Sequence, residues 1–171
     1  LPIVFSALLL SVFESGFPMF FSQNRTGFLG QTYILFKIRT MRLNAEEKNA
    51  KWAEVNDSRV TKTGSFLRKW RIDEIPQFWN VIKGEMSIVG PRPERPEFQE
   101  RLIKKVPHWN CRHLVKPGLT GWAQVKFRYA SDMESSEEKL AYDLYYIKHA
   151  SILMDIQIIL STLRSLAKGS R

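Results

Sequence analysis

The sequence of 171 residues is poor in the side chains that form disulfides and zinc sites. Its single cysteine, Cys111, excludes an internal disulfide framework and fits a reducing compartment. Its three histidines, His108, His113 and His149, do not have the spacing of zinc ligands, and no cysteine cluster accompanies them. We therefore expect no structural zinc site.

Acidic residues are also scarce, since 26 Lys and Arg stand against 17 Asp and Glu and leave a formal net charge of +9. Such a charge attracts anions, which include nucleic acids, anionic membrane surfaces and phosphorylated small molecules. Nucleic-acid binding is the weaker alternative, because the sequence contains no recognisable binding motif of that class. The hydrophobic content of 44% suffices for one core, so we expect a single globular domain.

A long uncharged apolar run stands at the start of the sequence, over residues 1–13. As a helix this run would cover about 20 Å, whereas the hydrocarbon core of a bilayer measures about 30 Å, so it is too short to span alone. A buried helix, the tail of a truncated transmembrane segment, or a re-entrant membrane helix with Pro2 near its bend would each explain it. We expect residues 14–18 to form a turn at the membrane boundary, and the chain to be part of a longer protein.

A β-hairpin is predicted after this turn, with its loop at residues 27–30. The second arm, residues 33–41, is rich in strand formers. Alternation along that arm places Lys37 and Arg39 on one face. The opposite, apolar face holds Ile34, Phe36 and Ile38.

The rest of the sequence is mostly helical in pattern, so the predicted fold class is α+β: a mostly helical domain with one small hairpin. Helices are expected at residues 65–70, 73–83, from 96 onward, 137–148 and 151–168, and the polar residues 44–56 also favour a helix. The helix that Pro96 opens repeats apolar residues one turn apart, at Phe98, Leu102 and Val106. The last helix is amphipathic, and its stripe fits either core packing or a helix lying flat in a membrane interface. That stripe consists of Ile152, Ile156, Ile159, Leu163 and Leu166.

Four charged residues gather before Pro76: Arg68, Arg71, Asp73 and Glu74. An Asp-Glu pair before a proline is typical of a helix N-terminus, where capping is the simplest explanation. The same place also suits phosphate, because a helix N-terminus offers free amide donors and partial positive charge, and the arginines add cations. A carboxylate kept ionised there can attack phosphorus, while its neighbour serves as a general base or a metal ligand.

Two prolines, Pro91 and Pro93, flank Arg92 and fix the backbone around its guanidinium. A rigidly held arginine suits bidentate recognition of phosphate, and a proline-stiffened surface loop is the alternative explanation. Residues 116–124 combine two glycines, a proline and Trp122, which favours a tight turn over any regular element.

Together these motifs resemble the bacterial sugar transferase family, the monotopic polyprenyl-phosphate phosphoglycosyl transferases that initiate capsule, O-antigen and exopolysaccharide synthesis. The resemblance extends over essentially the whole sequence, and so many runs in one order and spacing are highly specific. The matching runs are FSQNRTG at 21–27, FKIRTMR at 36–42, DSRVT at 57–61, IDEIPQFWNVIKGEMS at 72–87, VGPRPE at 89–94, KPGLTGWAQ at 116–124 and YDLYYIK at 142–148. The run PERPEF at 93–98 resembles the exopolysaccharide-linked branch.

This resemblance implies a phosphoryl transfer in two steps. Asp73 would attack the β-phosphate of a UDP-sugar, expel UMP and form an aspartyl phosphosugar, which a polyprenyl (undecaprenyl) phosphate then attacks. Glu74 would deprotonate or orient the acceptor phosphate, and Mg2+ held by Asp73 would neutralise the diphosphate. The implied phosphate-binding residues are Arg68 and Arg92, with Lys37 as a weaker candidate and Arg71 as a further cation.

The resemblance also implies a location at the bacterial inner membrane. Residues 1–18 would be the second arm of a re-entrant membrane hairpin with its boundary turn, and residues 19–171 the catalytic domain on the cytoplasmic face. Residues 125–129 depart from the pattern of many relatives where we expect sugar or nucleotide choice to be set, so the donor is left open, as is an oligomeric state. A catalytically silent membrane scaffold of the same fold is the alternative, against which the intact Asp73 and Glu74 argue.

Overall fold

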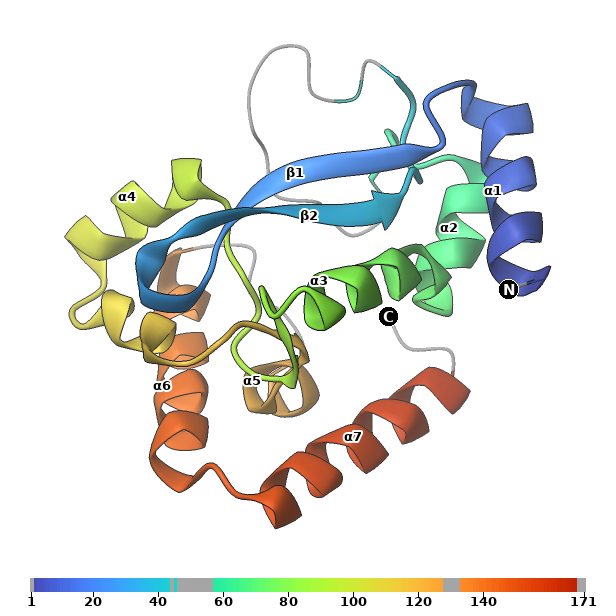
Figure 1. Cartoon of the computed structure of the whole chain (residues 1–171). Coiled ribbons are helices and arrows are strands. Elements are labelled where there is room, and N and C mark those ends of the chain that lie inside the picture. The colour runs from blue at the N-terminus through green and yellow to red at the C-terminus, as the bar shows by residue number, and fades with distance from the viewer. Residues whose placement is uncertain (1, 44, 46–56, 128–132, 169–171) are drawn as a thin grey trace.

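A computed structural model of the chain describes residues 2–43, 45, 57–127 and 133–168 (Figure 1). Helices predominate in these residues, and they are accompanied by an antiparallel pair, β1–β2, and a separate parallel pair, β3–β4. The predicted α+β class is therefore confirmed. The helix expected within residues 44–56 falls on a stretch that, apart from Ala45, lies outside the described residues.

The predicted hairpin is formed by β1 (Phe20–Thr26) and β2 (Thr32–Ile38), which pair from end to end around the short helix η1 (Phe28–Gly30). The predicted division of β2 into two faces is only partly right. Ile38 is buried, but Ile34 is half exposed. Leu35 and Lys37 instead share the face that meets the next helical segment, so this lysine points toward protein rather than water.

The apolar start of the chain forms helix α1 (Pro2–Ser15), which lies beside α2 (Lys62–Lys69) in Figure 1. The Glu14 carboxylate at its end accepts hydrogen bonds from the backbone N–H groups of Lys62 (2.8 Å) and Thr63 (2.7 Å). It therefore satisfies free donors at the N-terminus of α2. Within the described residues, no helix has both the length and the apolar character that crossing a membrane requires. Pro2 is the first residue of α1, and the membrane bend there stays a prediction.

Helix α2 begins earlier than predicted, because Thr61 caps it through a hydrogen bond from the Gly64 N–H to the threonine hydroxyl (2.9 Å). Glycine is required at position 64, since a Cβ there would lie 2.1 Å from the carbonyl oxygen of Thr40. The last turn of α2 carries Arg68, and it ends just before the sharp break at Arg71.

The helix predicted over residues 73–83 is two shorter elements, the 3-10 helix η2 (Ile72–Gln77) and α3 (Phe78–Ile82). Pro76 lies inside η2 and has no N–H to donate, which disfavours a regular α-helix at this point. Gly84 follows α3 with φ at 77°, the left-handed conformation that ends helices.

One hydrophobic core joins α4 (Pro96–Lys105), η3 (Trp109–Leu114) and α6 (Met133–His149). The three apolar residues predicted one turn apart lie in it, and α4 begins at Pro96 as predicted. The core consists of Phe98, Leu102, Val106, Trp109 and Leu140.

A second core lies between α7 (Ile152–Ala167), α5 (Trp122–Lys126) and the parallel pair β3 (Ser87–Val89) and β4 (Gly118–Thr120). The prediction for residues 116–124 was wrong, because this stretch supplies a strand and the start of a helix. A close approach between backbones explains its glycines: a Cβ on Gly118 would lie 2.1 Å from the backbone nitrogen of Gly90.

Most of the stripe predicted on α7 does not face this core, although its member Ile159 packs against it. Met154 and Ile158 are the buried residues of α7, while Ile152 is 80% exposed and Leu163 is 56% exposed. Because Tyr146 and Val89 pack against Met154 and Ile158, the helix is rotated so that most of its apolar stripe points outward. Core packing is therefore the wrong explanation for most of that stripe.

Candidate active site

The acidic pair lies in η2, directly after Arg71, whose backbone has the left-handed conformation (φ 51°). This break turns the chain so that Asp73 and Glu74 enter the interior at the start of a new element. No side-chain hydrogen bond caps η2 at its N-terminus. Capping, the simplest explanation of an Asp-Glu pair, therefore does not account for these two residues.

Glu74 is held by two cations. Its Oε1 lies 2.8 Å from Nη2 of Arg92 and 3.3 Å from Nζ of Lys37. Burial on its own would raise the pKa of Glu74, but Arg92, Lys37 and Arg71 together outweigh it and hold that pKa well below its usual 4.5. Glu74 is therefore a fixed negative charge, and a weak base.

Asp73 has the opposite character, although it is the next residue. It is 6% exposed, and burial, followed by the charge of Glu74, raises its pKa above the usual 3.8. Lys37, Arg68 and Arg92 act against that rise at longer range. In the described part of the chain no hydrogen bond or ion pair reaches the Asp73 carboxylate. It is a carboxylate whose charge the protein only partly compensates.

The remaining predicted cations complete the surroundings of the pair. Nε of Arg68 donates a hydrogen bond to the Thr40 hydroxyl (2.8 Å), which anchors this arginine while its charge acts on Asp73. Arg71 is largely desolvated, and its charge acts on Glu74. The structure thus brings together all six residues proposed from the sequence. They are Lys37, Arg68, Arg71, Asp73, Glu74 and Arg92.

The loop that carries Arg92 is fixed along its main chain. Its four successive carbonyl groups, from Pro91 to Glu94, each accept a hydrogen bond from another part of the chain. The donors are the N–H of Gly118 (3.0 Å), Nη2 of Arg112 (2.8 Å), Nη1 of Arg25 (3.0 Å) and the N–H of Thr26 (2.9 Å), in that order. The sequence predicted stiffness from the prolines, which lack N–H groups, and the structure adds the carbonyl partners.

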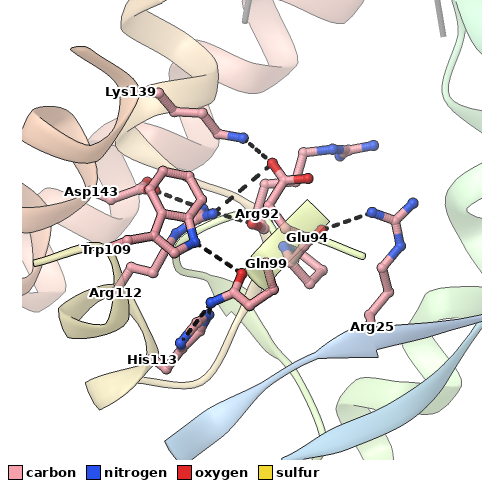
Figure 2. Close-up of polar contacts among 10 residues, drawn as sticks. Arg25, Arg92, Glu94, Gln99, Trp109, Arg112, His113, Lys139 and Asp143 are labelled. Carbon is pink, nitrogen blue, oxygen red and sulfur yellow. Dashed lines mark hydrogen bonds and ion pairs between the residues drawn. The ribbon is translucent and has the colours of Figure 1, made fainter. Parts of the chain in front are cut away.

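A second charged cluster, which the sequence analysis missed, lies behind this loop (Figure 2). Nη2 of Arg112 lies 2.7 Å from Oδ2 of Asp143, and both side chains are 1% exposed. Glu94 pairs with Lys139, and its Oε1 also lies 4.0 Å from Nη1 of Arg112. The only signal in the sequence is that Lys139 and Asp143 stand one helical turn apart, next to the buried Leu140.

Comparison with known proteins settles the family. The sequence profile described as bacterial sugar transferase matches residues 1–169. The chain belongs to this family. The roles of Asp73 and Glu74 are therefore to be understood as those of residues in a sugar transferase.

Three relatives illustrate the match. The UDP-N-acetylgalactosamine-undecaprenyl-phosphate N-acetylgalactosaminephosphotransferase of Aeromonas hydrophila is 41% identical over 98% of this chain and 40% of its own length. The UDP-glucose:undecaprenyl-phosphate glucose-1-phosphate transferase of Xanthomonas campestris pv. campestris is 43% identical over 85% of this chain and 31% of its own length. A Bacillus subtilis (strain 168) protein named uncharacterized sugar transferase EpsL is 41% identical over 87% and 70%. The chain thus spans well under half of the first two relatives.

The side chains available as metal ligands decide whether this site could hold a metal ion. Among the described residues, no group of three or more His, Cys, Asp or Glu side chains is arranged to hold a metal ion. Mg2+ needs no such cage, because it is commonly held by one or two carboxylates together with substrate phosphates. Asp73, with its partly compensated charge, is the carboxylate that fits this kind of site.

Proposed function

We propose that this chain is the catalytic part of an enzyme that transfers a sugar 1-phosphate from a UDP-sugar to undecaprenyl phosphate. Membership of the family and the names of the relatives support this reaction. Those names differ in the sugar, glucose in one and N-acetylgalactosamine in the other, so both donors are candidates.

The observation that carries the proposal is the unequal pair in η2. Asp73 is buried near three cations but is paired to none of them. A nucleophile needs this, because its carboxylate must be free to form a bond to phosphorus. In the proposed first step, a bond forms between a carboxylate oxygen of Asp73 and the β-phosphorus, and the bond to the UMP oxygen breaks. UMP leaves with that electron pair. In the second step an oxygen of the acceptor phosphate attacks the same phosphorus, and the Asp73 carboxylate is restored.

We assign Glu74 to orientation rather than to proton removal. A base is most effective when its pKa is near the working pH, whereas Arg92 and Lys37 keep the pKa of Glu74 low. Its negative charge instead fixes those two cations next to Asp73. Of the two roles implied by the resemblance, orientation is the one that this geometry supports.

The cofactor we propose is Mg2+, with Asp73 as its protein ligand. When bound, it would neutralise charge on the diphosphate as UMP leaves. Asp73 would then contact both the ion and the phosphate. The cations around it, above all Arg68 and Arg92, would bind the remaining phosphate oxygens.

We also propose that the site works at the cytoplasmic face of the bacterial inner membrane, where it meets its lipid acceptor. Large apolar side chains exposed on α1, α3 and α7 support this placement, among them Phe13 (88%), Ile82 (76%) and Leu153 (80%). Helix α3 directly follows η2, so exposed apolar residues adjoin the acidic pair in sequence. The division into residues 1–18 at the membrane and residues 19–171 as catalytic domain follows the same proposal. Synthesis of an exopolysaccharide is the pathway class that the PERPEF run favours.

The test measures UMP release by full-length protein in membranes, with Mg2+, undecaprenyl phosphate and a panel of UDP-sugars. We expect release with at least one donor, a loss of at least about 1,000-fold for Asp73→Asn, and a severe loss for Glu74→Gln. Asp155→Asn is the matched control, because Asp155 lies on α7 and accepts a hydrogen bond from Tyr146 (2.9 Å) away from the pair. Near-normal turnover by Asp73→Asn would refute the mechanism. No release by the wild-type protein with any donor would favour the silent scaffold.

A further inference from the structure

The main chain around Arg92 is held through its carbonyl groups. Neither Pro91 nor Pro93 has an N–H, so the backbone on both sides of Arg92 can be held only through carbonyl oxygens. Arg112 donates to the carbonyl of Arg92 (2.8 Å), and Arg25 donates to the carbonyl of Pro93 (3.0 Å). Two arginines from distant parts of the chain therefore hold the position of a third.

Arg112 is itself held from three sides, as Figure 2 shows. Its Nη2 bridges the Arg92 carbonyl and Oδ2 of Asp143, at 2.8 and 2.7 Å. The indole ring of Trp109 lies 4.4 Å from its guanidinium carbon, and Glu94 approaches from the side of the loop. With 1% of its side chain exposed, Arg112 does not itself reach a ligand in solvent.

We propose that Arg112, supported by Arg25, is a positioning residue that sets the place of the Arg92 guanidinium for substrate phosphate. This inference rests on the proposed function. Its physical basis is that Glu74 holds only the guanidinium end of Arg92, at 2.8 Å, so the place of that end also depends on where the backbone of Arg92 is held. A displacement of about 1 Å at a substrate-binding group can cost about 100-fold in rate.

The main variant is Arg112→Lys, which keeps the positive charge but removes the planar guanidinium that lies on the Trp109 ring and places Nη2 against both acceptors. We expect kcat/KM for UMP release by the full-length protein to fall about 10- to 100-fold. Arg101→Lys is the matched control, since Arg101 is exposed on α4 and lies outside the runs that match the family, and its turnover should be unchanged.

A double-mutant cycle separates positioning from general damage to the fold. If Arg112 acts through Arg92, the Arg112→Lys change should have little further effect on kcat/KM in an Arg92→Lys background. Losses that multiply in the double variant would overturn the inference, as would normal kcat/KM in Arg112→Lys. If Arg112→Lys yields no folded protein, Arg25→Lys takes its place in the cycle, because it leaves the pair between Arg112 and Asp143 intact.

Binding of UDP to the full-length protein, followed by calorimetry in the presence of Mg2+, is the second readout. It tests the inference even if the wild-type protein turns over no donor, and so separates failure of this inference from failure of the proposed function. We expect Arg112→Lys to bind UDP about 10-fold more weakly than the wild type. In an Arg92→Lys background, the same change should cause no further loss of binding. Unchanged binding in Arg112→Lys, or losses that multiply beside Arg92→Lys, would contradict the positioning role.

Discussion

Two clusters of the same residue types differ in their access to water. In the open cluster, Lys37, Glu74 and Arg92 surround Asp73, and the Arg92 side chain is 36% exposed. In the closed cluster, Glu94, Arg112, Lys139 and Asp143 lie behind the loop. Lys139 and Glu94 are 11% and 12% exposed, and the central pair of Arg112 and Asp143 is 1% exposed. A charged pair that water cannot reach can only stabilise the fold, whereas a charged side chain that water can reach is also able to bind a ligand.

Arg92 belongs to both clusters. Its guanidinium lies in the open cluster against Glu74, and its carbonyl oxygen accepts from Arg112 in the closed one. The closed cluster therefore acts on the open one through Arg92. If this division holds, substitutions in the closed cluster should lower the free energy of unfolding, and substitution of Asp73 should leave it nearly unchanged.

The largest loss of stability is expected for Asp143→Asn. The change leaves the Arg112 guanidinium buried without its partner at 2.7 Å, and breaking a buried pair from one side costs about 3–5 kcal/mol. Burial raises the pKa of Asp143 as it does that of Asp73, so removing its charge offsets part of this loss, but Asp143 differs from Asp73 in leaving a paired cation behind. The free energy of unfolding, from denaturant titration of the full-length protein in detergent, measures it. Lys83→Met serves as the control, because the pair between Lys83 and Glu85 is exposed and should change the same quantity by less than about 1 kcal/mol. A loss below about 1 kcal/mol for Asp143→Asn would show that the closed cluster does not organise the fold.

A smaller effect is expected from pH at the edge of the closed cluster. Trp109 Nε1 donates to Oε1 of Gln99 (2.9 Å), so the Gln99 amide nitrogen faces the ring of His113 (3.1 Å) and requires an unprotonated ring nitrogen. Burial, and then the charge of Arg112, lowers the pKa of His113 from 6.5 to about 4. The unfolded chain therefore binds the proton first, and stability falls as the pH drops from 6.5 to 4. We expect a loss of about 2–3 kcal/mol in this window.

The check is denaturant unfolding at several pH values. His113→Gln should remove the part of the loss between pH 6.5 and 4. His149→Gln should leave it in place, since His149 is exposed and its Nδ1 contacts the Tyr145 carbonyl on its own helix (2.9 Å). The further loss below pH 4.5 should persist in both variants, because Lys139 and Arg112 hold the pKa of Glu94 at about 2 against the effect of burial. An equal slope above pH 4.5 in wild type and His113→Gln would contradict this assignment.

The same contrast explains what could be predicted from the sequence. Elements whose signal is local were predicted: the hairpin, the start of α4 at Pro96, and the end of a helical segment near residue 83. Elements made by distant partners were not. The pair β3–β4 has three residues in each strand and depends on Gly90 and Gly118 meeting across the fold, which no local pattern indicates.

Within the site, the open cluster could be predicted because its residues stand in short motifs with a shared chemistry. The closed cluster could not, because Arg112 and Asp143 are ordinary charged residues in their own segments and acquire a role only when the chain brings them together. For a related reason the sequence left open whether the apolar stripe of α7 packs in the core or lies in a membrane interface. Its apolar residues outnumber those that the core can cover, so periodicity alone did not tell which stripe is buried.

The smallest effect on stability is expected for Asp73→Asn, the same change that should abolish turnover. Burial and Glu74 raise the pKa of Asp73 above 3.8, so ionising it costs more in the folded protein than in the unfolded chain. At every pH above 3.8 the ionised carboxylate therefore lowers the stability of the fold, and an amide of the same shape does not. Unfolding at pH 7 should show a free energy equal to that of the wild type or higher by up to about 1 kcal/mol. A loss beyond about 1 kcal/mol would place Asp73 with Asp143 among the residues that hold the fold together, and would remove the physical distinction on which its role as a nucleophile depends.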